Sequence, residues 1–526
     1  MNQIDELLPW NRVADLPDQP TPHSQSQDKR LTKRTPTVYL LHETIGGLIQ
    51  RFLTHQMYYT SSMRCAVAKK LALLFSGFLI SFFLVGRLQP RTRSNTFVFE
   101  GARLIPGDGT PPIENASIIV RQGMIDSVGA KGKLTIPRTA IRVDLSGKTI
   151  MPMLIDVHIH IGYMKVEDLQ GKPVIRKENY SRENILDQLQ RFEYYGVGAV
   201  QSLGTDRQGL EIQIRDEQRS GALRDPTLSL LFSAGDGILP SNNGSPNGGP
   251  SFANDVVHEV TNPLQARQYV EEEASKKVDS VKFWIDDRNG TKPTMRPEIY
   301  RAIIEEAHRK GLPVMAHIYY LDDAKAVVKA GVDGIAHPVR DKPIDKEFIE
   351  LMKERNVFQC STLSFMEPLD WIDDPELQET VGPKVRQAFK AEMGTIKTDN
   401  WKALWSLALQ NEKKESDAGI RIALCGDTGG LEGQFPGFTE HRELSALAQA
   451  GISPQDVIRD GTQVPANVLG LKTMGTLAPG KRADFIVLQK NPLENIDNIR
   501  NITAIYKAGR AIDRGSLKAK WMAQTP

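Results

Sequence analysis

The chain has 526 residues, with 66 Lys and Arg against 64 Asp and Glu, a net charge of +2, and three Cys. The near-zero net charge argues against a nucleic-acid-binding protein, which would usually be strongly basic. Three Cys without a Cys-x-x-Cys pair exclude a disulfide framework, a zinc ribbon and a thioredoxin-type site.

The N-terminal part differs from the rest in charge. Residues 1–94 hold twelve basic and six acidic residues, and the remaining chain holds 54 basic and 58 acidic ones. Residues 1–62, whose first part is rich in Pro, Gln, Asp and Thr, are predicted to be a disordered leader or the product of an upstream start codon. Residues 63–93 open with Met63 and contain the uncharged apolar run 71–86 after several basic residues. This order predicts a signal peptide or signal anchor, and hence export to the periplasm or the extracellular space. Residues 71–86 would be the contact with a membrane.

Both ends of the remaining chain show short alternating strands separated by turns that contain Gly. Examples are FVFEGARLI and IRVDL on one side, and ADFIVL and ITAIYKAGRAI on the other. We expect residues 94–150 and 471–526 to form one small composite β-sandwich domain.

Residues 151–470 alternate between polar helical stretches, Gly, and short apolar runs. Apolar runs without alternation are typical of parallel strands that are buried on both faces. About 320 residues of such units predict an α/β fold of the (β/α)₈ TIM-barrel type. A doubly wound sheet is the alternative, but MPMLIDVHIHIGY lacks the Gly-rich phosphate loop that it would require after its first strand.

Side chains that bind metals follow several of these apolar runs. His158 and His160 end LIDVHIH and share one face of a strand because they are two residues apart. Three further runs end alike, at His317, His337 and Asp427. Barrel enzymes carry their reactive groups at the carboxyl ends of strands, and imidazole with carboxylate suits zinc-class divalent ions. The pattern therefore predicts a metal site.

Lys282 lies inside the apolar strand DSVKFWI. A buried Lys is costly unless it is neutral or paired. A lysine at the rim of the strand that reaches solvent is the structural alternative. Beside a metal pair, the neutral amine could take up CO₂ and bridge both ions as a carbamate.

These motifs resemble the amidohydrolase superfamily over roughly residues 95–515, in its imidazolonepropionase-like and prolidase-like subgroup. MPMLIDVHIH, VKFW, LCGDTG and the two His-ending runs carry the resemblance. It implies two divalent ions, zinc being expected, with His158, His160 and Asp427 at the more buried ion. It further implies an N6-carboxylated Lys282 as the bridge, and His317 and His337 at the second ion. Met153 departs from the family pattern, in which a Gly usually stands at this position.

The chemistry expected from this site is hydrolysis of an amide-type C–N bond by a metal-activated hydroxide, with Asp427 as the catalytic base. The substrate class left open is a dipeptide, an N-acyl amino acid or a cyclic amide, so a dipeptidase is included. A lactone or ester hydrolase could use the same site. A deaminase is disfavoured because Tyr320 stands where related deaminases commonly have Glu, and a non-enzymatic binding protein is disfavoured because no ligand is missing.

Three residues that closely follow a ligand are candidate substrate contacts: Tyr163, Tyr319 and Arg340. Arg suits bidentate binding of a carboxylate. The expected partner is a small-molecule substrate and no nucleic acid. The Trp-bearing stretch 367–416 is a candidate for the pocket wall or for a contact within a homo-oligomer.

Overall fold

The computed structural model describes residues 96–166, 174–240, 253, 255–287, 290, 292–367, 369–393, 399–431 and 433–523. All of them belong to one compact unit, Ser94–Pro526. The predicted leader 1–62 and signal segment 63–93 lie outside the described residues. Within those ranges, no helix is long and apolar enough to cross a membrane.

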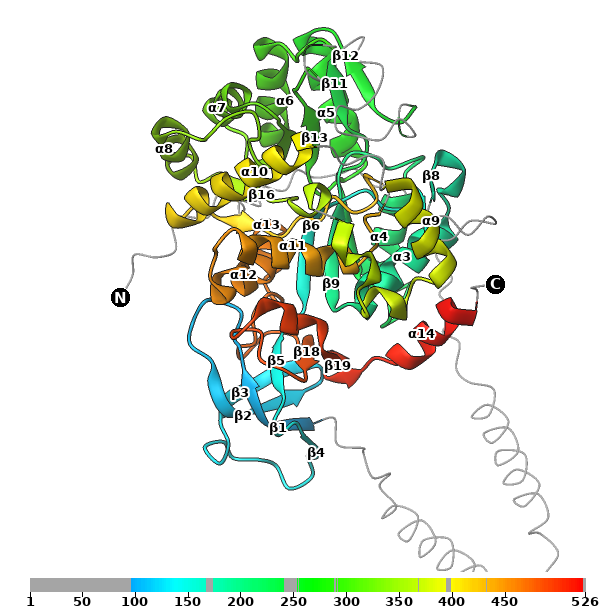
Figure 1. Cartoon of the computed structure of the whole chain (residues 1–526), viewed down its shortest axis with the longest axis vertical. Coiled ribbons are helices and arrows are strands. Elements are labelled where there is room, and N and C mark those ends of the chain that lie inside the picture. Colours follow the sequence, from blue (N-terminus) through cyan, green and yellow to red (C-terminus); the bar gives the residue numbers. More distant parts are fainter. Residues whose placement is uncertain are drawn as a thin grey trace, which may run out of the picture. The chain divides into compact units, whose positions relative to one another are not determined.

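Strands from both ends of the unit form one eight-stranded sheet (Figure 1). Its path runs β20-β19-β18-β5-β1-β2-β3, and β4 pairs with β1. The strands are β1 Thr96–Leu104, β2 Ile113–Arg121, β3 Met124–Ala130, β4 Ile141–Asp144, β5 Thr149–Pro152, β18 Phe485–Leu488, β19 Ile502–Lys507 and β20 Arg510–Ala511. The antiparallel pairing of β5 with β18 joins the two ends of the sequence. Packing of Phe99 against Phe485 and Tyr506 fills the core beside it.

The middle of the chain forms parallel strands. One sheet has the order β10-β9-β6 and the other the order β12-β11-β13-β14-β15-β16-β17. The strands are β6 Leu154–Ile159, β9 Val197–Ser202, β10 Leu230–Ser233, β11 Ile238–Pro240, β12 His258–Val260, β13 Val281–Trp284, β14 Val314–His317, β15 Gly334–Ala336, β16 Phe358–Cys360 and β17 Ile422–Ala423. A separate short pair is formed by β7 Met164–Lys165 and β8 Val174–Ile175. β6, β9, β13 and β14 are buried along their whole length, which explains their apolar composition.

Helices follow most of the parallel strands, as the alternating sequence pattern predicted. Those between parallel strands are α3 Arg182–Tyr194, α4 Leu210–Ser220, α5 Pro263–Ser275, α6 Pro297–Arg309, α7 Leu321–Ala330, α8 Lys346–Glu354, α9 Pro383–Met393 and α10 Asp399–Asp417. After the last parallel strand come α11 Phe438–Gln449, α12 Pro454–Gly461 and α13 Gln463–Val468, and α14 Arg514–Ala523 follows β20. Short 3₁₀ turns are η2 Lys177–Asn179, η4 Ser364–Met366, η5 Leu369–Asp373, η6 Leu377–Glu379 and η7 Ile496–Arg500. Gly331 closes α7 with φ +100°, a left-handed conformation that favours glycine, and β15 begins three residues later.

Met153, at the departure from the family pattern, is buried between β5 and β6. Gly198 on β9 makes room for it, since a Cβ there would lie only 3.1 Å from the Cβ of Met153. The substitution is therefore absorbed by local packing, and β6 still leads directly to His158 and His160.

Candidate metal centre

Six predicted side chains lie at or near the carboxyl ends of five parallel strands. His158 is in β6, and His160 directly follows that strand. His317 is the last residue of β14, and His337 directly follows β15. Asp427 comes four residues after β17, and Lys282 lies within β13. All six side chains are buried.

The paired histidines and the aspartate converge. Oδ1 of Asp427 lies 3.3 Å from Nε2 of His158 and 3.2 Å from Nε2 of His160. Their potential ligand atoms all lie within 4.8 Å of one another, so one ion could contact the three side chains. Oδ1 of Asp427 is buried and, among the described residues, has no hydrogen-bond partner. A buried carboxylate oxygen with this surrounding fits a metal ligand.

Lys282 contacts the same ring nitrogen of His158 that faces Asp427. Its Nζ is 3.4 Å from Nε2 of His158, and its side chain is 0% exposed. Burial lowers the pKa of Lys282 from 10.5 to about 7, although the Asp427 carboxylate opposes this shift. A substantial share of the amine, about half at pH 7, is thus in the neutral form that carbamate formation requires.

His317 and His337 form the second part of the cluster. Their ring centroids are 4.4 Å apart, and the His337 ring is 5.2 Å from that of His158. Burial lowers the pKa of His317 to about 4 and holds the pKa of His158 and His337 well below 6.5. Neutral imidazoles are the form that binds metals. Nδ1 of His317 is buried and lacks a hydrogen-bond partner within the described part of the chain.

The backbone is strained at two of these residues. His337 has φ +75° and Asp427 has φ +52°. Non-glycine residues in this region cost about 1–3 kcal/mol each and occur preferentially at functional sites. The loop after Asp427 also needs Gly429, because a Cβ there would lie 2.0 Å from the carbonyl oxygen of His160.

The side chains that contact the histidine ring nitrogens facing away from the other predicted ligands were not identified from the sequence. Nδ1 of His160 contacts Oγ1 of Thr205 at 3.1 Å, and Nδ1 of His337 contacts Oγ1 of Thr362 at 2.8 Å. Nε2 of His317 contacts Oδ2 of Asp286 at 2.7 Å. Thr and Asp after strands are too common for the sequence to single these residues out, although Asp286 follows Lys282 by four positions.

A disulfide lies beneath the centre. Cys360 and Cys425 are paired with their Cα atoms 5.5 Å apart, and Sγ of Cys360 is 3.5 Å from Nδ1 of His158. Nothing in the sequence indicated this pairing. Because the disulfide sulfur can only accept, Nδ1 of His158 is the donor and Nε2 faces Asp427 and Lys282.

The candidate substrate contacts differ in their surroundings. Arg340 is 8% exposed, and its guanidinium lies 4.8 Å from the Tyr319 ring and 5.5 Å from the Phe365 ring. Phe365 in turn packs against Trp401 and faces His337. Tyr163 is fully buried, and its hydroxyl donates to the carbonyl of Thr205 at 2.7 Å.

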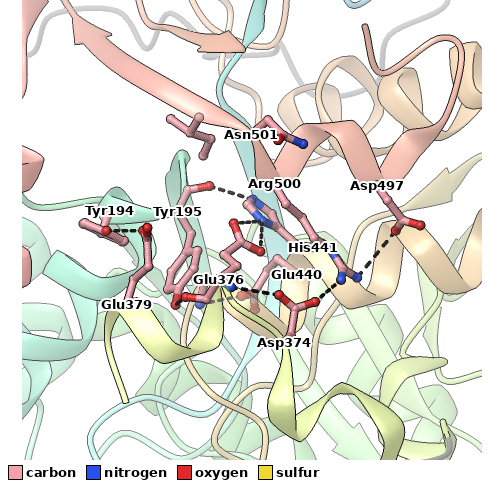
Figure 2. Close-up of polar contacts among 12 residues, drawn as sticks. Tyr194, Tyr195, Asp374, Glu376, Glu379, Glu440, His441, Asp497, Arg500 and Asn501 are labelled. Atoms are coloured by element: carbon pink, nitrogen blue, oxygen red, sulfur yellow. Dashed lines mark hydrogen bonds and ion pairs between the residues drawn. The ribbon is translucent and has the colours of Figure 1, made fainter. Parts of the chain in front are cut away.

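His441 belongs to a different polar network (Figure 2). Its Nε2 contacts the carbonyl oxygen of Tyr195 at 2.8 Å, and its Nδ1 contacts the Glu376 carboxylate at 2.9 Å. Arg500 extends the same network by pairing with Asp374. These contacts fasten the segment around η5 and η6 to α11, so His441 has a structural role there.

A family model described as the amidohydrolase family matches residues 149–512. The chain is 26% identical over 448 residues to ochratoxinase from Aspergillus niger, covering 79% of this chain and 86% of the relative. Imidazolonepropionase from Paracoccus denitrificans is 23% identical, covering 71% and 88%. A crystal structure of a Xaa-Pro dipeptidase superposes with a TM-score of 0.61 at 20% identity, covering 79% and 99%.

Proposed function

The chain belongs to the amidohydrolase family, and on this basis we propose that it hydrolyses an amide-type C–N bond of a small molecule, with two divalent metal ions. The observation that carries the proposal is the convergence of His158, His160 and Asp427 on one point, with Lys282 3.4 Å from His158. The donors are imidazole and carboxylate, which suit zinc.

In this proposal His158, His160 and Asp427 hold the first ion, and His317 and His337 hold the second. Lys282 would hold both ions once its neutral amine had added to CO₂, a step that forms the N–C bond of a carbamate and releases one proton. When bound, such ions acidify water and polarise a carbonyl group. Asp427 accepts the proton of the attacking water and passes it to the leaving nitrogen. The buried surroundings of these groups strengthen each electrostatic contact.

We propose that residues 151–470 form a closed (β/α)₈ barrel around this site. The two parallel sheets would then be two parts of the same barrel. A backbone hydrogen bond from Val157 to Leu424 (3.1 Å) and a bridge between Ile159 and Thr428 support one seam. The bond from Asp279 to Ser233 (2.8 Å) supports the other. Residues 94–150 and 471–526 are proposed as the composite β domain, which the shared eight-stranded sheet supports.

Arg340 is proposed to bind a carboxylate of the substrate. Its described hydrogen bond goes to the carbonyl of Pro338, and in the part of the chain that the structure describes it has no ion pair with a carboxylate. A buried cation is costly without an anion, and a substrate carboxylate would supply one. Tyr319 and Phe365 would contact the apolar part next to that carboxylate. Tyr163 would not contact the substrate. It would hold Thr205, which in turn contacts His160.

The substrate class is therefore proposed to be a dipeptide or N-acyl amino acid with a free carboxylate. One of the superposable structures is named as a Xaa-Pro dipeptidase, so dipeptides are the substrates to test first. The purified, zinc-loaded full chain should hydrolyse members of a panel of dipeptides and N-acyl amino acids. Metal content is measured on the same sample. A panel that stays inert with two ions bound would contradict the proposal and direct attention to lactones and cyclic amides.

Arg340→Met should raise KM for free-acid substrates and leave it unchanged for the matching methyl amides. Arg340→Lys retains the charge but not the planar fork, so an intermediate KM is expected. An equal loss on acids and amides would contradict carboxylate binding by Arg340.

Export through residues 63–93, with cleavage or anchoring at 71–86, is also proposed. A disulfide such as Cys360–Cys425 is typical of proteins in oxidising compartments, which supports the proposal. Cell fractionation and N-terminal sequencing of the native protein test it, and recovery of residues before Met63 would contradict the proposal that residues 1–62 are absent from the native protein. A homo-oligomer remains a prediction that light scattering can check.

A further inference from the structure

The second ring nitrogen of each histidine in the centre has its own partner. His158, His160 and His337 are held at Nδ1, by Cys360, Thr205 and Thr362 respectively. His317 is held at Nε2 instead, and its partner is the carboxylate of Asp286. His317 is therefore contacted by its neighbour at the opposite ring nitrogen from the other three histidines.

The contact with Asp286 determines which nitrogen of His317 is free. An ionised carboxylate only accepts hydrogen bonds, so Nε2 must carry the proton in this 2.7 Å contact. A neutral imidazole has one protonated nitrogen, which leaves the lone pair on Nδ1. Nδ1 is buried and, as far as the described residues extend, has no hydrogen-bond partner.

Asp286 is built into the same strand end as Lys282. It follows β13 by two residues and is itself buried. Its neighbour Asp287 differs, because the Asp287 carboxylate accepts from the hydroxyl of Tyr320 at 2.9 Å. Of the two adjacent carboxylates, only Asp286 contacts a residue of the metal centre among the described contacts.

We propose that Asp286 is a positioning residue that makes Nδ1 of His317, rather than Nε2, the ligand of the second metal ion. The inference rests on the proposed two-ion site. Outer carboxylates of this kind fix the tautomer and orientation of a ligating histidine and raise its basicity.

Zinc affinity of the full chain, measured by chelator competition with metal counting, tests the proposal. For Asp286→Ala we expect unchanged affinity for the first ion and a loss of about 10–100-fold for the second. Asp286→Asn retains an oxygen that can accept from Nε2 and should lie close to the wild type. Asp287→Ala is the matched control and should bind both ions normally. In a crystal structure of the zinc-loaded protein, the second ion should lie on Nδ1 of His317.

The outcomes separate this inference from the proposed function. If Asp286→Ala binds both ions as tightly as the wild type, or if the ion lies on Nε2, the positioning role is wrong while the two-ion hydrolase stands. If Asp286→Asn loses the second ion as fully as Asp286→Ala, Asp286 is itself a ligand and the inference fails. If the wild type binds one ion only, the two-ion proposal fails first.

Discussion

Nζ of Lys282 lies 3.4 Å from Nε2 of His158, with both side chains fully buried. A protonated lysine would be unfavourable there, because it would face an imidazole and not a counter-ion at hydrogen-bond distance. The low pKa of Lys282, about 7, follows from that burial. A neutral amine next to a histidine that faces Asp427 is what a carbamate bridge needs as its starting point.

The first prediction concerns formation of that carbamate. Below pH 7 the amine becomes an ammonium and cannot attack CO₂, whereas above pH 7 it is neutral. At an equal concentration of dissolved CO₂, metal-depleted protein should therefore regain activity with zinc about tenfold faster at pH 8 than at pH 6. Titration of His158, His317 or His337 does not cause this difference, since burial holds the pKa of all three well below 6.5. Equal recovery at both pH values, or recovery in CO₂-free buffer, would argue against the carbamate.

Replacement of the lysine gives the matching variant test. Lys282→Ala should lose the second ion and nearly all turnover, whereas Lys329→Ala on the surface of α7 should do neither. Metal counting and steady-state kinetics provide the readout. Full activity of Lys282→Ala would remove the bridging role.

The second prediction concerns Asp427. Its Oδ1 faces Nε2 of both paired histidines and has no other described partner, so it serves the site rather than the fold. Asp427→Asn should remain folded and lose at least about 10²–10⁴-fold in kcat, the usual contribution of a general base. Asp322→Asn, an exposed ion-pair residue, is the control. Thermal unfolding shows whether the variant is folded, and wild-type turnover would exclude the base role.

Much of this centre could be predicted from the sequence because each donor ends or interrupts an apolar run. His158, His160, His317, His337 and Asp427 are visible in this way, since buried parallel strands read as continuous apolar segments. Lys282 is visible because a charge inside such a segment is rare.

The surrounding groups could not be predicted because their signals are not local. Cys360 and Cys425 are 65 residues apart, and only the packing of β16 beside β17 brings them together. Thr205 and Thr362 are hydroxyl residues of the kind found in any loop, so their contacts with His160 and His337 depend on the folded geometry. The sequence also does not show that the parallel strands divide into two sheets. One of the two sheets ends at β17, which is only two residues long.

The third prediction concerns the disulfide. In the chain-entropy picture, a bond that closes about 65 residues stabilises the folded state by about 4 kcal/mol. Cys360→Ser with Cys425→Ser should lower the free energy of unfolding by up to that amount. It should also weaken binding of the first ion, because the acceptor of His158 Nδ1 changes. The denatured, unreduced full chain should show one free thiol, that of Cys65, out of three Cys. Three free thiols would show that the bond does not form.

The fourth prediction concerns alkaline stability. Glu412 and Glu415 on α10 are fully buried, and their carboxylate oxygens have no hydrogen-bond partner among the described residues. Burial raises the pKa of Glu415 to about 8, and burial together with Glu415 raises that of Glu412 well above 4.5. The folded state therefore keeps protons that the unfolded chain releases above about pH 4.5. The contribution of Glu415 to stability should fall as the pH rises from about 5 to about 8, by about 1.4 kcal/mol per pH unit, and Glu412 acts in the same direction.

Glu415→Gln removes one of these titrating groups, because the Gln side chain does not bind or release a proton in this pH range. The free energy of unfolding of this variant, measured by denaturant titration between pH 5 and pH 9, should depend less steeply on pH than that of the wild type. At pH 8 the variant should be more stable than the wild type. Folding of the wild type at this pH requires either a buried, ionised Glu415 or uptake of a proton from solvent, and both cost free energy. Glu350→Gln, at an exposed position of α8, should leave the pH dependence unchanged. If Glu415→Gln and the wild type show the same slope, Glu415 is ionised in the folded state and draws a counter-charge from a group that the described contacts do not include.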